Sequence, residues 1–225
     1  MPSQPLPPLS QPMGFLSDIH GNLEALQAVL DELEQESIRE IFVAGDLLYG
    51  GDAPLEVWKR LQEVEAKCVR GLSDTALCLV DPKTLVAANP NEEIMARRFA
   101  ETRRKLGDLV IERLRRLPER LRIPLIDGSE IVLVHGSPAD PSTEVSHDMS
   151  DEELLSLVGD DPADIIVCGG SHVPFQRILP ETVLANVGSV GSAPGGRHAH
   201  YTVITPRMDG AAIEQRYLSL SKRRS

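Results

Sequence analysis

Cysteine is rare in this sequence, and long apolar runs are missing from it. The three cysteines, Cys68, Cys78 and Cys168, are an odd number and lack the spacing of metal ligands. We expect reduced, mostly buried thiols of a cytoplasmic protein, which excludes a disulfide-stabilised scaffold. No stretch approaches the roughly 20 apolar residues that span a bilayer, so no membrane association is expected. The opening MPSQPLPPLSQP also lacks the basic and apolar segments of a signal peptide.

Basic residues are outnumbered by acidic ones, 23 to 34, which gives the 225-residue chain a formal net charge of −11. Because a nucleic-acid binder usually carries a basic field, this balance argues against nucleic acid as a partner. Residues 97–122 depart from the balance, with ten Lys or Arg and four Asp or Glu. We interpret this segment as a solvated helix face, with a phosphate-attracting surface as the alternative.

Residues 13–220 are expected to form a single domain, between a flexible proline-rich tail at 1–12 and a basic tail at 221–225. In the first half, short apolar runs alternate with helical patterns, which is typical of a parallel α/β sheet. The runs lie at 13–17, 41–44 and 68–69, and the helical patterns at 23–33, 54–64 and 90–117.

Strand signals dominate the second half. Asp127-Gly128 separates two apolar runs, 121–126 and 130–134, and predicts a hairpin. Further strands are expected near 164–168, 175–179, 182–187, 200–205 and 211–217, and Ser150 with Glu153 forms a capping box that opens a helix before them. We therefore predict an α/β fold, a four-layer α/β/β/α sandwich in which two mixed β-sheets pack face to face between helices.

Aspartate and histidine follow four of the predicted strands, each time beside glycine. Asp18 and His20 follow the first strand, Asp46 the second, and His135 and His172 come after two later ones. Each could instead be a helix cap or a hydrogen-bonded turn residue. However, ligands gather beyond the carboxyl ends of strands in open α/β sheets. Oxygen and imidazole ligands suit Mn²⁺, Fe, Zn²⁺ or Mg²⁺, so the pattern favours a divalent-cation site.

Several motifs together resemble those of the calcineurin-like metallophosphoesterase superfamily, in particular its compact bacterial phosphodiesterases and diadenosine-tetraphosphatase-like members. They are SDIHGN at 17–22, AGDLLYGGDAP at 44–54, VRG with a following aspartate at 69–74, LVHGSP at 133–138, SHVPF at 171–175 and NVGSVG at 186–191. The resemblance covers nearly the whole chain from Met13. It implies the metallophosphoesterase fold and a cytoplasmic hydrolase that attacks the phosphate ester of a small substrate with metal-activated water.

The resemblance also implies one or two divalent ions, with Mn²⁺ first and Fe, Zn, Mg or Ni as alternatives. The implied metal ligands are Asp18, His20, Asp46, His135 and His172, of which Asp18, Asp46 and His135 are also catalytic. By the same matching, Asp46 bridges a first ion, held with Asp18, His20 and His172, and a second ion held with His135. Substrate binding is expected from Asn22, Ser171, Gly188 and Ser189, although the glycine-rich run from 188 also fits a plain tight loop.

The sequence departs from the family pattern beside the second ion. Leu72 and Gly170 stand where the family has an asparagine and a histidine ligand, and Ser73 stands where a histidine acts as general acid or phosphate contact. Three outcomes are open: a weak second ion, a single ion, or a replacement ligand. The candidates for replacement are Asp74, His147, Asp148 and His198.

A rival function follows from these losses. A catalytically retired member of the fold would serve as a protein-interaction or ligand-sensing module, with a protein partner. The intact first set of ligands favours the enzyme. A nuclease is a third hypothesis, and it requires the basic segment 97–122 to face the site. Substrate, native metal and oligomeric state stay open at this stage.

Overall fold

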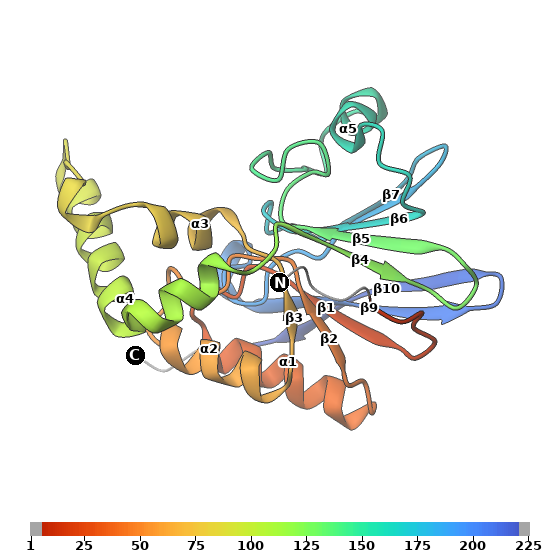
Figure 1. The fold of residues 1–225 in the computed structure, drawn as a ribbon, viewed down its shortest axis with the longest axis horizontal. Helices are drawn as coiled ribbons and strands as arrows, with labels where there is room; N and C mark the ends of the chain where they lie inside the picture. The colour runs from red at the N-terminus through yellow and green to blue at the C-terminus, as the bar shows by residue number, and fades with distance from the viewer. Residues whose placement is uncertain (1–5, 221–225) are drawn as a thin grey trace.

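The computed structural model describes residues 6–220 as two packed five-stranded β-sheets with helices around them (Figure 1). The first sheet contains β1 (Met13–Leu16), β2 (Glu40–Val43), β3 (Lys67–Cys68), β9 (His198–Arg207) and β10 (Gly210–Ser219). The second contains β4 (Arg120–Pro124), β5 (Glu130–Val134), β6 (Ile165–Cys168), β7 (Phe175–Ile178) and β8 (Val183–Asn186). The predicted basic tail at 221–225 lies outside the described residues.

Both sheets are mixed. The first has the order β10-β9-β1-β2-β3, in which β1, β2 and β3 are parallel and β9 is antiparallel to β1 and β10. The second has the order β4-β5-β6-β8-β7, in which β5, β6 and β8 are parallel and the two edge strands are antiparallel. The parallel strands bring their carboxyl ends to one edge of each sheet, which is where a site is expected.

The helices are α1 (Leu23–Gln35), α2 (Pro54–Glu63), α3 (Leu72–Leu79), α4 (Pro90–Arg115) and α5 (Asp151–Val158), with short 3₁₀ helices η1 (Pro82–Thr84) and η2 (Pro194–Gly196). In Figure 1, α1 and α2 lie along the outer side of the first sheet and α5 beyond the second, while α3 and α4 extend past one end. The predicted class, two mixed sheets flanked by helices, is confirmed. None of the described helices has the length and apolar character needed to cross a membrane.

Helix α3 was not predicted from the sequence. Its first turn is stabilised by Asp74, whose buried carboxylate accepts the backbone N–H of Gly71 at 3.1 Å. An aspartate three residues after the N-cap satisfies a backbone donor that the helix leaves free. The apolar pattern over 72–79 is short, and the glycine cap offered no serine or threonine signal, so the capping by Asp74 went unrecognised.

Two basic residues of 97–122 join α4 to α3. Arg103 donates to the carbonyl oxygens of Leu77 and Val80, and Arg115 donates to that of Cys78 at 2.7 Å. These carbonyls lie at the end of α3, where a helix carries partial negative charge. Other arginines pair with glutamates one turn away, as Arg116 does with Glu112. This arrangement fits the interpretation of a solvated helix face better than that of a phosphate-attracting surface.

Part of the predicted N-terminal tail is attached to the second sheet. Leu9 pairs with Leu125 in a parallel bridge, with its N–H donating to Pro124 and its carbonyl accepting from Ile126. The tail prediction therefore needs correction at this residue, because two backbone hydrogen bonds hold it to the strand end. Residues 1–5 of that predicted tail lie outside the described residues.

The core between the sheets centres on two stacked phenylalanines. Phe15 of β1 and Phe42 of β2 have ring centroids 5.2 Å apart, and both are fully buried. They pack in one cluster with Ile131, Leu133 and Val167 of the second sheet. This cluster joins the two sheets and thereby fixes the relative positions of their strand ends.

We expect Phe42→Ala to lower the free energy of unfolding by about 3–5 kcal/mol, because it opens a cavity between the sheets. Denaturant unfolding measures the loss. Ile178→Ala, at a side chain that is 81% exposed, should change the same quantity by less than about 0.5 kcal/mol. Equal losses in the two variants would contradict the assignment of Phe42 to the inter-sheet core.

Candidate metal centre

Five predicted ligands meet at the edge where the parallel strands end. Asp18 follows β1, Asp46 follows β2, His135 directly follows β5 and His172 follows β6, with His20 two residues after Asp18. Two groups of three have ligand atoms within 4.8 Å of one another: Asp18, His20 and His172, and Asp18, Asp46 and His135. Asp18 is common to both groups, whereas the resemblance implied that Asp46 is shared.

The distances describe a compact cluster. His172 Nε2 lies 3.1 Å and His20 Nε2 3.5 Å from Asp18 Oδ1. His135 Nε2 lies 3.5 Å from Asp46 Oδ1, and His20 Nε2 lies 3.9 Å from Asp46 Oδ2. The structure thus brings all five predicted metal ligands together, with carboxylates and imidazoles alternating around one small volume.

Each histidine ring is held by a backbone carbonyl. His20 Nδ1 lies 2.7 Å from the carbonyl oxygen of Tyr49. His135 Nδ1 lies 2.7 Å from that of Ala44, and His172 Nδ1 lies 3.0 Å from that of Ser192. Because a carbonyl only accepts, Nδ1 carries the proton and donates it. Nε2 of each ring then presents a lone pair to the cluster, which is the arrangement that second-shell carbonyls impose on metal-binding histidines.

The cluster has more acceptors than donors. When both rings are neutral and protonated at Nδ1, the Nε2 atoms of His20 and His172 are two lone pairs only 3.1 Å apart. With Nε2 of both rings unprotonated, the buried Asp18 Oδ1 also has no hydrogen-bond donor among the described residues. A buried acceptor without a partner is costly, and so are facing lone pairs. A divalent cation among these atoms would satisfy all of them, so the residues fit a metal ion.

The backbone at the cluster is strained. Among the described residues, six that are not glycine have positive φ, and four of these are predicted ligands: Asp18 at 53°, His20 at 50°, Asp46 at 53° and His172 at 61°. Such conformations are uncommon for residues with a side chain and concentrate at functional sites. They turn successive side chains sharply toward one point beyond the strand ends.

Two glycines allow the loops to approach the aspartates. A Cβ at Gly71 would overlap with Oδ1 and the backbone nitrogen of Asp46, and one at Gly169 would overlap with Ser17 Oγ. The neighbouring amides are then close enough to donate: Ser73 N–H to Asp46 Oδ1 at 2.8 Å and Gly170 N–H to Asp18 Oδ2 at 2.9 Å. These bonds orient both carboxylates.

The pKa values follow from burial and from the mixture of charges. Burial would raise the pKa of Asp18, but His172 and His20 hold it well below its usual range. Burial would lower the pKa of His20, but the carboxylates of Asp18 and Asp46 raise it to about 9. Asp18 likewise raises the pKa of His172. Without a cation the cluster therefore retains protons, so binding of a metal ion is expected to release them.

The positions that depart from the family pattern lie beside Asp46 and His135. A Cβ at Gly170 would lie 3.8 Å from His135 Nε2 and 3.9 Å from Glu144 Cγ. Leu72 begins α3 and is 57% exposed. No motif in the sequence contains Glu144, so its position near Gly170 could not be predicted. Neither metal-ligand group contains any of the replacement candidates Asp74, His147, Asp148 and His198.

Those four candidates are engaged elsewhere. Asp74 accepts the N–H of Leu47 as well as that of Gly71, and burial together with the negative charge of Asp46 raises its pKa to about 7. His147 packs near Phe175, with ring centroids 6.4 Å apart, and His198 makes an edge contact with Tyr217. Asp148 is exposed. Asp74 is therefore a buried cap that joins the loop after Asp46 to α3.

The predicted substrate-binding residues already have partners in the fold. Asn22 caps α1 by accepting from Ala25 N–H at 3.1 Å. Ser189 is buried and donates to the carbonyl of Asp18 at 2.8 Å, so it positions that ligand. The Gly188 N–H donates to Asn186 Oδ1, and Ser171 Oγ donates to the carbonyl of Val173. Their contact with a substrate stays a prediction.

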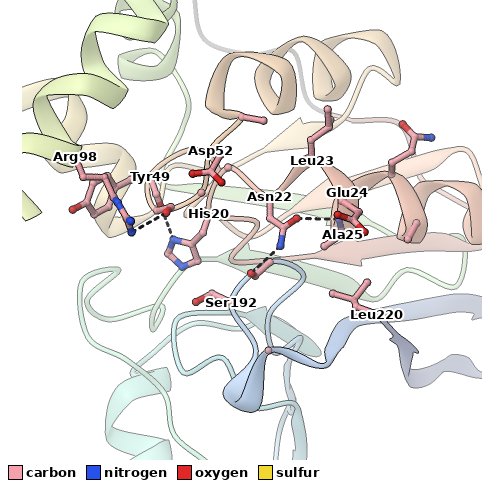
Figure 2. A pocket seen from close by; sticks show the side chains of 18 of the residues that line it. His20, Asn22, Leu23, Glu24, Ala25, Tyr49, Asp52, Arg98, Ser192 and Leu220 are labelled. Atoms are coloured by element: carbon pink, nitrogen blue, oxygen red, sulfur yellow. Dashed lines mark hydrogen bonds between the residues drawn. The ribbon is translucent and has the colours of Figure 1, made fainter. Parts of the chain in front are cut away.

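A cavity of about 1080 Å³ opens beside the cluster and includes His20, Asn22 and Ser192 in its lining (Figure 2). Figure 2 shows Arg98 and Tyr49 on one side of His20 and Ser192 on another. The Arg98 guanidinium reaches over from α4 and donates to the carbonyl of Gly50 at 3.3 Å. Arg98 thus brings one positive charge of the basic segment to this cavity, and periodicity alone does not indicate its position.

The calcineurin-like phosphoesterase superfamily domain matches residues 12–209, and the chain belongs to this superfamily. An uncharacterized protein of Methanocaldococcus jannaschii is 26% identical over 181 residues, which cover 79% of this chain and 69% of that protein. Phosphodiesterase YfcE of Escherichia coli K12 is 26% identical over 200 residues, covering 84% of this chain and 85% of the enzyme.

Solved structures share the fold at lower identity. A metallophosphoesterase from Sphaerobacter thermophilus superposes with a TM-score of 0.73 at 22% identity, covering 92% of this chain and 88% of that one. A hypothetical protein from Pyrococcus horikoshii superposes with a TM-score of 0.77 at 21% identity, covering 95% of this chain and 89% of that one. The two-sheet architecture described above is therefore that of metallophosphoesterases.

We expect Asp74→Ala to lower the free energy of unfolding by about 2–4 kcal/mol, because two buried N–H groups lose their acceptor. Asp81→Ala makes the same change at an exposed cap, where Lys83 N–H donates to Asp81 at 3.0 Å and water can take over. It should cost about 1 kcal/mol or less. Denaturant unfolding of both variants checks this, and a smaller loss for Asp74→Ala would refute its role as a buried cap.

Proposed function

We propose that the protein is a metal-dependent phosphoesterase that hydrolyses the phosphate mono- or diester of a small substrate with water. The observation that carries the proposal is the cluster of carboxylates and imidazole lone pairs in a chain of the calcineurin-like phosphoesterase superfamily. Its buried Asp18 Oδ1 has no hydrogen-bond partner in the part of the chain that the structure describes. The phosphodiesterase activity named for the Escherichia coli relative supports the reaction class.

In this proposal Asp18, His20, Asp46 and His172 hold one divalent cation, and Asp46 and His135 contribute to a second. A cation bound there supplies Lewis acidity toward phosphoryl oxygens and lowers the pKa of a bound water. Oxygen and nitrogen ligands without thiolate fit Mn²⁺, our first choice, and also Fe, Zn²⁺, Mg²⁺ or Ni²⁺.

The chain's own residues keep the reacting atoms in place. The carbonyls of Tyr49, Ala44 and Ser192 fix the three imidazoles, and the N–H groups of Ser73 and Gly170 fix the two carboxylates. Because these are backbone contacts, the ligand geometry is set before substrate arrives. Arg98 adds positive charge at the mouth of the adjacent cavity, which would attract an anionic phosphate.

We infer that the second cation binds more weakly than the first. Leu72 has no lone pair, and Gly170 has no side chain, so the side of the cluster at Asp46 and His135 has fewer ligands. Ser73 replaces the histidine expected as a general acid, so we propose a slower or narrower enzyme. The same departures favour the second candidate function, a retired fold that serves as an interaction or sensing module.

We place this activity in the cytoplasm. The three cysteines are buried free thiols, which fits a reducing compartment. A small phosphorylated molecule is the proposed partner, since the cavity beside the cluster has the size of a ligand site.

We expect Mn²⁺-dependent hydrolysis of bis(p-nitrophenyl) phosphate, and a loss of at least about 100-fold in kcat/KM in Asp46→Asn because a metal ligand is weakened. Release of p-nitrophenolate measures the rate. Asp209→Asn makes the same change at an exposed turn residue and should keep the activity of the unaltered protein. Equal rates in all three proteins would refute the proposed centre, and inactivity of the unaltered protein with Mn²⁺ bound would favour the retired-fold function.

Metal titration tests the inequality of the two sites. We expect one Mn²⁺ per chain to bind tightly by calorimetry, and His172→Ala to weaken that ion by about 10-fold or more. Restoring both missing ligands in Leu72→Asn/Gly170→His should strengthen a second ion by about 10-fold, since histidine tolerates the positive φ of position 170 better than most residues. Two equally tight ions in the unaltered chain would overturn the inference of a weakened site.

A further inference from the structure

A second cavity lies between α3 and α4, adjoins the metal-ligand cluster at Asp46 and shares Tyr49 with the lining of the first cavity. We call it the α3–α4 pocket. Its volume is about 420 Å³, and its lining includes Asp46, Tyr49, Leu72, Val86, Met95 and Phe99. This volume is within the range of small-molecule sites. The function described so far makes no use of it.

Several apolar side chains around the pocket are exposed to solvent. Leu72 is 57%, Val86 92% and Met95 59% exposed. Single exposed apolar side chains are ordinary, but several around one concave site mark a binding surface. Phe99 and Tyr49 add aromatic surface, with ring centroids 5.7 Å apart in an edge contact. Rings and a methionine thioether together suit a flat, polarisable ligand.

The pocket is continuous with the metal-ligand cluster through Asp46. This residue belongs to the pocket lining, while its Oδ1 lies 3.5 Å from His135 Nε2. A molecule in the pocket would therefore place one end at the cluster. Leu72, which stands where the family has a metal-binding asparagine, contributes apolar surface at this junction instead.

The polar groups of the pocket are occupied except at the end near Asp46, where the buried Ser73 Oγ has no hydrogen-bond partner among the described residues. Glu92 accepts from Ala88 N–H and from the Asn89 side chain, both at 2.7 Å. The Tyr49 hydroxyl donates to the carbonyl of Met95 at 3.4 Å. A peptide segment would bring backbone donors and acceptors that need partners, whereas an apolar ring needs none. The occupant that fits is an apolar ring.

We propose that the α3–α4 pocket binds an aromatic ester group of the substrate, whose phosphate lies at the metal-ligand cluster. The substrate class is thus an aryl or similarly apolar ester of phosphate. This inference rests on the proposed phosphoesterase function and adds the part of the molecule that sets specificity.

The test compares phenyl phosphate with 2-naphthyl phosphate on the Mn²⁺-loaded protein. Their leaving groups have nearly the same acidity, so the second ring mainly changes buried apolar area. A ring that buries about 50 Å² more should raise kcat/KM by about tenfold. In Met95→Gln this preference should fall to about threefold or less. Met208→Gln, the same change at a side chain that is 79% exposed in the β9–β10 turn, should retain it.

Binding of unreactive phosphonates gives a readout independent of catalysis. We expect calorimetric affinity to rise from methylphosphonate to benzylphosphonate to 1-naphthylmethylphosphonate, to require Mn²⁺, and to lose its size dependence in Met95→Gln but not in Met208→Gln. Size-ordered binding without hydrolysis of any ester would support the pocket and reject the proposed catalysis. Hydrolysis with no effect of ring size or of Met95→Gln would support the catalysis and overturn the pocket, leaving its apolar rim for a protein partner.

Discussion

The structure depends on one electrostatic constraint: several acceptors are held together with too few protons to satisfy them. Asp18 is fully buried. When the imidazoles are neutral, one of its oxygens has no hydrogen-bond donor within residues 6–220, and the lone pairs of two imidazoles face each other across 3.1 Å. Such a cluster is stable only if a cation completes it or if protons are taken up, and the raised pKa of His20 shows the second alternative. The surrounding fold must hold these groups together although the contacts between unpaired acceptors are unfavourable.

The sandwich meets that demand with backbone contacts. The strained φ angles at Asp18, His20, Asp46 and His172 cost on the order of 1–3 kcal/mol each and persist only where neighbours over-determine them. Close approach at two glycines, carbonyl contacts to each histidine and the Asp74 cap are those neighbours. The stacked pair in the inter-sheet core then fixes the two sheets, and hence the strand ends from which the loops start.

Much of this could be predicted from the sequence because it depends on local pattern. Buried runs ended by Asp or His beside glycine marked the strand ends, and parallel topology required those ends to converge. The fold class and the meeting of the five ligands followed. The rest depends on tertiary contacts that have no local signal. Helix α3 is specified by a carboxylate that reaches two loops, and the positions of Arg98 and Glu144 depend on how distant segments pack. The pocket between α3 and α4 is formed by side chains that periodicity alone would assign to a surface.

The departures at positions 72, 73 and 170 are more coherent than random decay of a site. Loss of a catalytic function would relax the first set of ligands as readily as the second, yet all four of its side chains are present and oriented by backbone hydrogen bonds. On the other side, Leu72 replaces a lone pair by apolar surface in the lining of a cavity that also contains Asp46. In the function and the substrate site that we propose, Leu72 supplies apolar surface where a metal ligand is missing. We infer that weaker binding of the second ion and apolar contact with the substrate belong together, because one residue, Leu72, accounts for both.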